Sequence, residues 1–453
     1  MNSLTNTLIN TSNAISPIDG RYASKTLELQ TYFSEYSLNK YRVYIEIKYL
    51  IALANYKVLT ITSKELIFLN SIYQNFSVED NAIVKEIESI TNHDVKSIEY
   101  YIREKVSTLK NKTIENHIHF GLTSQDINSS ANMLGIKNAV LNVIIPNIEI
   151  IMRKICHLIE KWGRYPLLAM THGQPASPTI FSKELLVFFE RIIVQVNILE
   201  KIEYTTKFGG AVGNFNAHYV SYPDMNWVDF ANAFVKSLGL KRNKYTTQID
   251  HYDNYSEIFD CIKRINVICI DMCQDMWLYI SRNVLTQKIN KKEVGSSAMP
   301  HKVNPINFEN AEGNFLLANA LLELFSRKLP VSRLQRDLTD STLLRNVGSA
   351  FSYTLIALKS LQTGLSKIDI NRVQIKKELN NNHIVIAEAI QTKMKVLGIE
   401  NSYEKMKEIT RKRQHVTQLK EDLDTFINSL EISDNDKQKL LEITPFNYVG
   451  KFR

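Results

Sequence analysis

LLVFFERIIVQVNIL, residues 185–199, is the stretch that decides the fold of this 453-residue chain. Its apolar residues recur in alternating steps of four and three, at Leu185, Phe189, Ile192, Val196 and Leu199. Those steps keep the apolar side chains on one face of a helix that packs along its length against other helices. The stretch therefore predicts a core helix of a bundle.

Similar apolar faces predict further long helices on both sides of this stretch. Helices of about 30 residues exceed the mean of about 11–12 residues in globular proteins, and helices of this kind form bundles. Gly and Pro number only 15 and 10, which favours uninterrupted helices over hairpins. Because such helices carry more than one apolar face, we expect subunits to associate by bundling. The predicted helices with apolar faces are 126–163, 255–290 and 306–328, and residues 34–56 and 79–110 are also predicted to be helical.

The predicted fold class is therefore all-α, with a central long-helix bundle. The chain is about three times as long as a typical domain, so several domains are expected. We divide it into an N-terminal helical domain (1–112), a central bundle domain (113–365) and a C-terminal helical domain (366–453).

The breaks between the predicted helices are short and rich in Gly, Ser, Thr, His, Pro and Asn. Function concentrates in loops that a rigid scaffold holds in place. The candidate site loops are therefore 119–126, 171–179 and 293–305.

The net charge of +8 does not indicate a nucleic-acid-binding protein. Such proteins cluster Lys and Arg to neutralise phosphates, whereas the densest basic runs here are short, at 291–292 and 411–413. The N-terminus lacks the basic start and apolar core of a secretion signal, and no apolar run approaches about 18 residues. We expect a cytoplasmic protein with no membrane partner.

The four cysteines predict buried thiols rather than disulfides or a metal site. Two of them are four residues apart, but no second pair of His or Cys at matching spacing completes a metal site. They are Cys156, Cys261, Cys269 and Cys273.

The strongest functional signal is GSSAMPHKVNP, residues 295–305. Its small residues permit a loop whose backbone N–H groups can bind an anion. Two hydroxyls, an ammonium group and an amide within it suit recognition of a carboxylate. Taken alone, such a loop is either a binding site or a plain linker.

This loop resembles the signature of the fumarase/aspartase superfamily, whose members release fumarate by β-elimination. Several branches of the superfamily share the pattern, so it indicates no particular substrate. THGQPA (171–176) is similar to a second block of the superfamily, and TSQD (123–126) is similar to a first.

Further motifs resemble the purine-nucleotide branch, and most closely the bacterial adenylosuccinate lyase family. They occur in order and, with the blocks above, extend the resemblance over nearly the whole chain. They are SPIDGRY (16–22), TNHDVK (91–96), YTTQ (245–248) and SRLQRDLTDSTLLR (332–345).

The resemblance implies the elimination of fumarate from adenylosuccinate, giving AMP, and from succinylaminoimidazole carboxamide ribotide, giving AICAR. It implies nucleotide substrates and chemistry without a metal or another cofactor. It also implies a homotetramer in which each active site draws on three subunits.

By resemblance, Ser296 is the base that takes a proton from the succinyl group, and His172 is the acid that protonates the leaving nitrogen. A serine hydroxyl is a weak base, so Lys302 and loop N–H groups are expected to stabilise its alkoxide. Histidine suits the acid role because its proton is available near neutral pH. His93 is expected to assist the acid.

The resemblance also assigns residues that bind the two ends of the substrate. Hydroxyls, Lys and Asn suit the succinyl carboxylates, and the guanidinium fork of Arg matches a phosphate. The residues are Arg21, Tyr22, Asn92, His93, Asp94, Thr123, Ser124, Gln248, Ser297, Lys302, Val303, Asn304, Asn310, Arg336, Ser341, Thr342, Leu343, Leu344 and Arg345.

Three other interpretations stay open at this point. An argininosuccinate lyase or carboxymuconate-type enzyme would have less use for the Arg residues of 21–22 and 336–345, because its substrate carries no phosphate. A binding protein that kept only the fold would be free to lose Ser296, His172 and Lys302. A nucleic-acid-binding protein would associate with its partner in a steeply salt-sensitive way.

Several residues are interpreted as structural rather than functional. His157, His383 and His415 are assigned no role, Arg333 and Asp337 are expected to form an ion pair, and His251 with Asp253 is too small a set for a metal. The chain departs from the family pattern at 208–210 and in ending early after Tyr448.

Overall fold

The computed structural model describes residues 13–288, 299, 302–411 and 416–452. The chain forms two compact units, each assembled from three stretches of sequence. Unit 1 comprises Met1–Glu149, Val194–Ile270 and Ala311–Lys359, and unit 2 comprises Ile150–Ile193, Asp271–Asn310 and Ser360–Arg453. Because long helices pass from one unit into the other, these units do not test the predicted domain boundaries, which stay a prediction.

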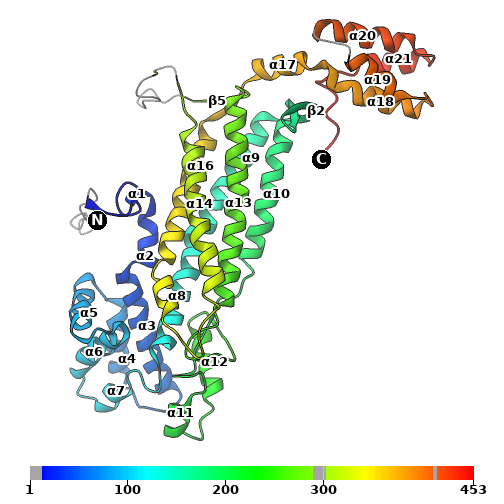
Figure 1. The fold of residues 1–453 in the computed structure, drawn as a ribbon. Helices are drawn as coiled ribbons and strands as arrows, with labels where there is room; N and C mark the ends of the chain where they lie inside the picture. The colour runs from blue at the N-terminus through cyan, green and yellow to red at the C-terminus, as the bar shows by residue number, and fades with distance from the viewer. Residues whose placement is uncertain (1–12, 289–298, 300–301, 412–415, 453) are drawn as a thin grey trace. The chain divides into compact units, whose positions relative to one another are not determined.

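The first part of unit 1 consists of helices that begin at capping residues. Helix α3 follows Ser34, whose hydroxyl accepts from the backbone N–H of Ser37, and it confirms the predicted helix 34–56. Capping boxes at Thr62 and Ser77 begin α4 and α5. The elements are α1 (Ala23–Thr26), η2 (Leu27–Leu29), α2 (Gln30–Phe33), α3 (Glu35–Asn55), α4 (Ser63–Gln74), α5 (Val78–Thr91), α6 (Asp94–Ser107) and α7 (Lys112–His117), in blue shades in Figure 1.

The prediction of one helix over 79–110 is wrong, because the chain turns sharply within it. Asn92 has a left-handed backbone (φ 50°) and ends α5, and His93 then caps α6. Asn tolerates this conformation because its short polar side chain can bond locally. The two helices therefore fold back and pack against each other.

The predicted helix 126–163 is confirmed as a helical run of 39 residues, Ser124–Trp162. It consists of α8 (Ser124–Ala139), a π-helical turn η3 (Val140–Ile144) and α9 (Ile145–Trp162). Pro146 accounts for the wider turn, because proline lacks an N–H and crowds the carbonyl one turn earlier. This run is apolar and long enough to cross a membrane, but 61% of its most apolar window is buried inside the protein, as in a core helix.

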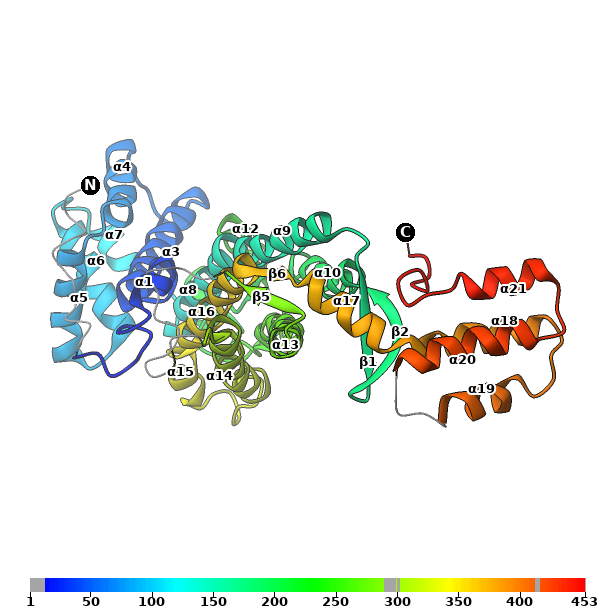
Figure 2. The same ribbon diagram turned by 90° about the horizontal axis from the view of Figure 1, so that it is seen from above.

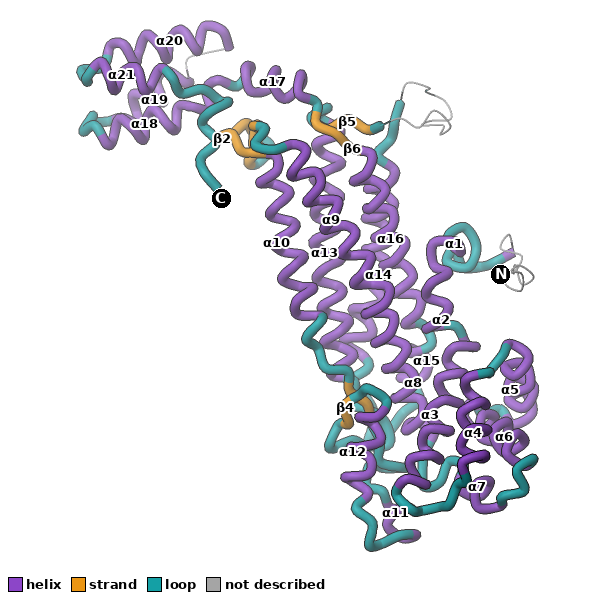
Figure 3. The backbone as a smooth tube through the Cα atoms, turned by 180° about the vertical axis from the view of Figure 1, so that it is seen from behind, coloured by secondary structure: helices purple, strands orange, loops and turns teal. Residues whose placement is uncertain are grey.

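Three long helices run side by side in Figures 1 and 3: α13 (Asp253–Ser281), α14 (Ile306–Lys328) and α16 (Val347–Lys367). Within unit 1, the amide of Asn266 on α13 donates to Asn319 of α14 at 3.0 Å. The ring of Phe259 packs against Phe325 and Phe351 from the other two helices. The predicted helix 306–328 is confirmed, whereas the predicted helix 255–290 is too long, because α13 ends at Ser281.

Three small sheets interrupt the helices in the described part of the chain. The break at 171–179, which we expected to be a loop, forms most of an antiparallel hairpin, β1 (Pro166–Thr171) and β2 (Gln174–Ile180). Proline is tolerated in β2 because both strands of a two-stranded sheet are edge strands. The other strands are β3 (Thr205–Thr206), β4 (Lys241–Arg242), β5 (Leu285–Gln287) and β6 (Ile368–Ile370).

Short helices form the C-terminal part of unit 2, and three more short helices belong to unit 1. In unit 2, α18 to α21 enclose a small apolar core of Ile390, Met394, Met406, Leu423 and Ile427, orange to red in Figure 2. The elements of unit 2 are α17 (Arg372–Asn381), η4 (His383–Ile386), α18 (Ala387–Val396), α19 (Ser402–Arg411), α20 (Val416–Ser429) and α21 (Asp434–Leu441). Those of unit 1 are α11 (Asn216–Ser221), α12 (Trp227–Ser237) and α15 (Thr339–Leu344).

Helix α10 (Phe181–Leu199) contains the stretch that predicted the bundle. Four of the five predicted core residues are buried, and Phe188 is buried in place of Phe189, which is half-buried. A second apolar row on the same helix is between 36% and 48% exposed, namely Leu186, Val187, Val194 and Ile198. The helix therefore presents two apolar faces, as the sequence predicted.

Candidate active site

The loop 119–126 is anchored by the buried carboxylate of Asp126. Its Oδ1 accepts from Lys207 Nζ at 2.7 Å and from the backbone of Gly209 at 2.8 Å, and Oδ2 accepts from the backbone of Thr123 at 2.8 Å. The Asp126 and Lys207 side chains are both 0% exposed. Buried charges are stable when they are paired and hydrogen-bonded in this way. Thr123 and Ser124 are thereby fixed, half-exposed, at the start of α8.

The segment 208–213 includes residues 208–210, where the chain departs from the family pattern, and its backbone N–H groups at Gly209 and Gly210 donate to this carboxylate. Gly210 and Gly213 have left-handed backbones, with φ of 78° and 84°, which glycine adopts without strain. A Cβ on Gly213 would overlap the carbonyl oxygen of Thr246. The glycines therefore join two predicted site segments, 123–126 and 245–248.

His119, which the sequence did not single out, holds the other end of the same loop. Its backbone is left-handed (φ 59°), and its Nδ1 lies 2.5 Å from Oε1 of the fully buried Glu46. Burial alone would lower the pKa of His119, but the carboxylates of Glu46 and Glu99 outweigh it, so the pKa is raised. The loop is thus tied to α3 by a charge-assisted bond.

Replacing His119 by Gln is expected to lower stability most at acid pH. A histidine whose pKa is raised on folding contributes stability that is fully present below its unfolded pKa of about 6.5. That contribution is lost as the pH rises through the folded pKa. Thermal melts should show His119→Gln further below the parent at pH 6 than at pH 9, with the exposed His157→Gln as the control. Equal gaps at the two pH values would contradict the assignment.

The corner between α5 and α6 presents three of the predicted residues, Asn92, His93 and Asp94. His93 is the N-cap of α6, and its Nδ1 accepts from the backbone N–H of Lys96 at 3.1 Å. In the neutral ring the proton therefore lies on Nε2. The His93 side chain is 51% exposed, so this proton is available to a bound molecule.

Arg42 of α3, also missed from the sequence, fixes the neighbouring Asp94. Its guanidinium donates to Asp94 at 2.5 Å, to Asn128 at 2.8 Å and to Asn39 at 2.9 Å. Burial would raise the pKa of Asp94, but Arg42 and the backbone N–H of Val95 outweigh it, so the pKa lies below its usual value. Asp94 is therefore an oriented carboxylate at neutral pH.

A cavity of about 230 Å³ in unit 1 lies beside this pair, lined by Asp94, Leu344 and Arg345 among others. A smaller hollow of about 50 Å³ adds Ser341 and Gln125. The Gln125 side-chain oxygen is buried and has no hydrogen-bond partner in the described part of the chain. Predicted residues from distant parts of the sequence thus converge on one concave surface.

A second group of predicted residues surrounds Arg336. Its guanidinium donates to Gln248 Oε1 at 3.1 Å and to Ser341 Oγ at 3.4 Å. The backbone N–H of Ser341 donates to Asp340, which also accepts from the buried Tyr252 hydroxyl at 2.8 Å. Helix α15 carries Ser341, Thr342, Leu343 and Leu344, and Arg345 follows it as the C-cap.

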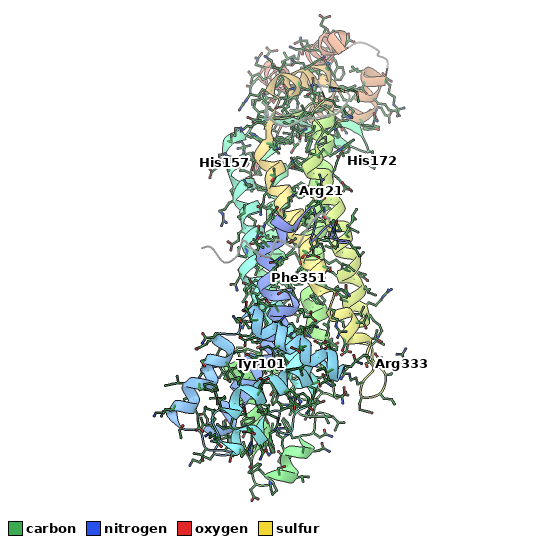
Figure 4. All side chains as sticks on the ribbon, turned by 90° about the vertical axis from the view of Figure 1, so that its left-hand side faces the viewer. Arg21, Tyr101, His157, His172, Arg333 and Phe351 are labelled. Carbon is green, nitrogen blue, oxygen red and sulfur yellow. The ribbon has the colours of Figure 1, made fainter. Side chains whose placement is uncertain are left out.

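The motif 16–22, which carries Arg21 and Tyr22, forms a turn. Backbone bonds from Gly20 to Ser16 and from Tyr22 to Pro17 close it. Arg21 is exposed, Tyr22 is half-buried, and Figure 4 labels Arg21. Lys359 Nζ donates to the carbonyl of the nearby Lys25 at 2.6 Å and pairs with Glu28 at 2.5 Å.

His172 lies at the tip of the β1–β2 hairpin in unit 2 (Figure 4). It and Gly173 both have positive φ, 54° and 72°, as the two central residues of a type I′ turn require. Because the turn is tight and His172 is exposed, its imidazole is accessible to solvent. The predicted acid, His172, is therefore exposed to solvent rather than buried.

The end of the predicted site loop 293–305 and the nearby Asn310 of α14 make hydrogen bonds within unit 2. The Val303 carbonyl accepts from Gln287 at 3.0 Å, and Asn310 on α14 accepts from the Ser360 hydroxyl at 2.6 Å. Lys302 is exposed and Asn304 is half-buried. The predicted base Ser296 and its neighbour Ser297 lie outside the described residues.

Comparison with known proteins decides the family. Residues 20–318 match the lyase family, and residues 332–449 match the family described as adenylosuccinate lyase C-terminal. The chain is 50% identical over 461 residues to the adenylosuccinate lyase of Dictyostelium discoideum, covering 99% of each chain. This chain belongs to the adenylosuccinate lyase family. It is also 45% identical over 444 residues to the adenylosuccinate lyase of Escherichia coli (strain K12), covering 97% of this chain and 96% of that one.

Solved structures confirm the fold of this adenylosuccinate lyase family member. A fumarate lyase from Mesorhizobium sp. BNC1 matches with a TM-score of 0.76 at 16% identity, covering 93% of this chain and 95% of that one. The β-carboxy-cis,cis-muconate cycloisomerase of Acinetobacter calcoaceticus matches with a TM-score of 0.73 at 17% identity, covering 95% and 97%. The predicted all-helical lyase fold is therefore confirmed.

The expected ion pair and three of the four expected buried thiols are present in the described part of the chain. Arg333 and Asp337 form an ion pair at 3.2 Å, although it lies in the loop before α15 rather than on a helix. Cys261, Cys269 and Cys273 are buried free thiols, and Cys156 is half-buried. Among the described residues, no group of three or more His, Cys, Asp and Glu is placed to hold a metal ion.

Proposed function

We propose that this enzyme eliminates fumarate from adenylosuccinate to give AMP, and from succinylaminoimidazole carboxamide ribotide to give AICAR. Its membership in the adenylosuccinate lyase family over nearly its whole length carries this assignment. The two substrates share a succinylamino group and a ribose phosphate, so one site can bind both. The cytoplasm is the proposed compartment.

The geometry of unit 1 suits the nucleotide part of the substrate. Arg336 is pre-oriented by Gln248 and Ser341, and a guanidinium held in this way can bind a phosphate with two parallel bonds. Arg21 and Arg345 are exposed. These arginines favour a phosphate-bearing substrate over argininosuccinate.

The acid and base roles follow from what the elimination needs. A base removes a proton from the succinyl carbon, and an acid protonates the departing nitrogen as the C–N bond breaks. We assign the base to Ser296, assisted by Lys302, and the acid to His172. His93, with its proton on Nε2, and the oriented Asp94 support the proton transfer.

We further propose that the active sites are shared between the subunits of a homotetramer. An exposed His172 at a hairpin tip suits donation of its imidazole to a site built largely by another subunit. The second apolar row of α10 and the exposed Leu316 and Leu317 of α14 suit helix bundling between subunits.

The near-ultraviolet spectrum of adenylosuccinate with the purified enzyme tests the function. We expect conversion to AMP and fumarate without added metal or cofactor, and no conversion of argininosuccinate. Ser296→Ala should abolish the conversion, whereas Ser429→Ala, on the exposed surface of α20, should not. A folded oligomer that leaves adenylosuccinate unchanged but acts on another succinyl compound would contradict the substrate assignment.

A further inference from the structure

The hairpin that carries His172 contains an irregularity that turns one side chain toward the C-terminal helices. Between the pairs Leu168–Pro178 and Met170–Pro175, strand β2 has one residue more than β1. A bulge of this kind bends a strand and redirects a side chain. Ser177 lies in it, and its hydroxyl donates to Oε2 of Glu388 in the first turn of α18.

The end of the chain reaches the same carboxylate oxygen. The Tyr448 hydroxyl donates to Glu388 Oε2 at 3.0 Å. Glu388 lies at a helix N-terminus, where the helix dipole favours a negative charge. Burial and the adjacent Glu388 raise the pKa of Tyr448, so the phenol keeps the proton that it donates. One carboxylate thus joins the hairpin to the closing residues.

A second contact holds the base of the hairpin to the last residues of the chain. Arg164, two residues before β1, donates to the carbonyls of Gly450 at 3.2 Å and Phe452 at 3.3 Å. Its guanidinium also lies 4.8 Å from the centre of the Phe452 ring. Gly450 has φ of 62°, which lets the chain turn at this point. We call these contacts, made by Ser177, Glu388, Tyr448 and Arg164 with residues 450–452, the C-terminal clasp.

We infer that the C-terminal clasp positions His172 for proton transfer by holding its hairpin. An isolated two-stranded hairpin is only marginally stable in water, so its tip is not fixed by its own ladder. A misplacement of about 1 Å at a catalytic group can lower a rate about 100-fold. The clasp residues are therefore positioning residues for the acid. This inference rests on the proposed role of His172.

Paired substitutions at the shared oxygen test the clasp. Ser177→Ala and Tyr448→Phe should each lower kcat for adenylosuccinate roughly three- to tenfold and leave KM within about twofold, because the nucleotide-binding residues are untouched. The double variant should lose less than the product of the two effects, since both donors serve one oxygen. Glu388→Gln, which keeps an acceptor oxygen, should retain more activity than Glu388→Ala. Ser429→Ala and Tyr403→Phe are matched controls on the same helical cluster.

Hydrogen exchange gives a second readout that does not depend on activity. The backbone amides of 166–180 should exchange faster in Glu388→Ala and Tyr448→Phe than in the parent, and unchanged in the controls. Unchanged kcat and unchanged exchange in Glu388→Ala would overturn the inference. So would a fall in kcat matched by the controls or by an equal rise in KM.

His172→Ala, measured in parallel, separates the clasp from the proposed function. If His172→Ala is inactive while the clasp variants behave as the parent does, the clasp alone is wrong. If His172→Ala retains full activity, the acid assignment is wrong and the clasp falls with it.

Discussion

Replacing His172 by Ala is expected to lower kcat for adenylosuccinate by roughly 10²–10⁴-fold, the usual contribution of a general acid. The leaving nitrogen would depart without a proton, so the barrier to C–N cleavage would rise. KM should change little, because the proposed nucleotide-binding arginines of unit 1 are untouched. Steady-state kinetics check this, and the exposed His157→Ala should keep the activity of the parent.

Mixing two inactive variants tests whether the active sites are shared. If Ser296 and His172 of one site come from different subunits, mixed tetramers of Ser296→Ala and His172→Ala contain some intact sites. Random assembly of equal amounts should restore about one site in four. The mixture must be unfolded and refolded together, and separately refolded variants that are then combined serve as the control. No recovery in a correctly assembled mixed tetramer would contradict shared sites.

The second large effect is expected at Lys207, which pairs with Asp126 inside unit 1. Lys207→Met keeps the length and the apolar stem of the side chain but leaves the Asp126 carboxylate buried without its partner. Breaking such a pair costs about 3–5 kcal/mol. Burial lowers the pKa of Lys207, and the negative charge of Asp126 opposes this effect. The attraction between the two charges therefore offsets part of the cost of burying them.

Thermal or chemical unfolding measures this loss, with Lys241→Met as the matched control. Lys241 pairs with Glu203 at 2.5 Å, but its side chain is 62% exposed. Exposed ion pairs contribute little to stability, so Lys241→Met should unfold at the same temperature or denaturant concentration as the parent. Because Asp126 also accepts from the Thr123 backbone, the remaining folded fraction of Lys207→Met should bind substrate less tightly. Equal stability of the two variants would show that the buried pair does not anchor the loop.

The sequence alone predicted the long helices well, because their signal is local. A helix repeats every 3.6 residues, so an apolar face can be recognised within one stretch, as in 185–199. The motifs 123–126, 171–176 and 332–345 were likewise found from short patterns. The same local reasoning failed where one residue changed the path of the chain. Asn92 split a predicted helix, and the break at 171–179 became a hairpin.

The tertiary structure decided which charged groups face each other. Arg42, His119 and Lys207 occur in ordinary sequence surroundings, and nothing near them in the chain shows that they pair with Asp94, Glu46 and Asp126. The partners come from distant segments. Ser177, Glu388 and Tyr448 likewise meet only in the folded chain.

The physical reason for this division is the range of each interaction. Periodicity, capping and turn geometry act over a few residues, so the sequence by itself determined the helical bundle and the chemical groups that lie in the breaks between its helices. Desolvation acts on whatever the folded chain buries, and a buried charge is stable only beside a partner. The tertiary structure therefore decided the orientation of Asp94, the anchoring of Thr123 and Ser124, and the display of His172 at a hairpin tip.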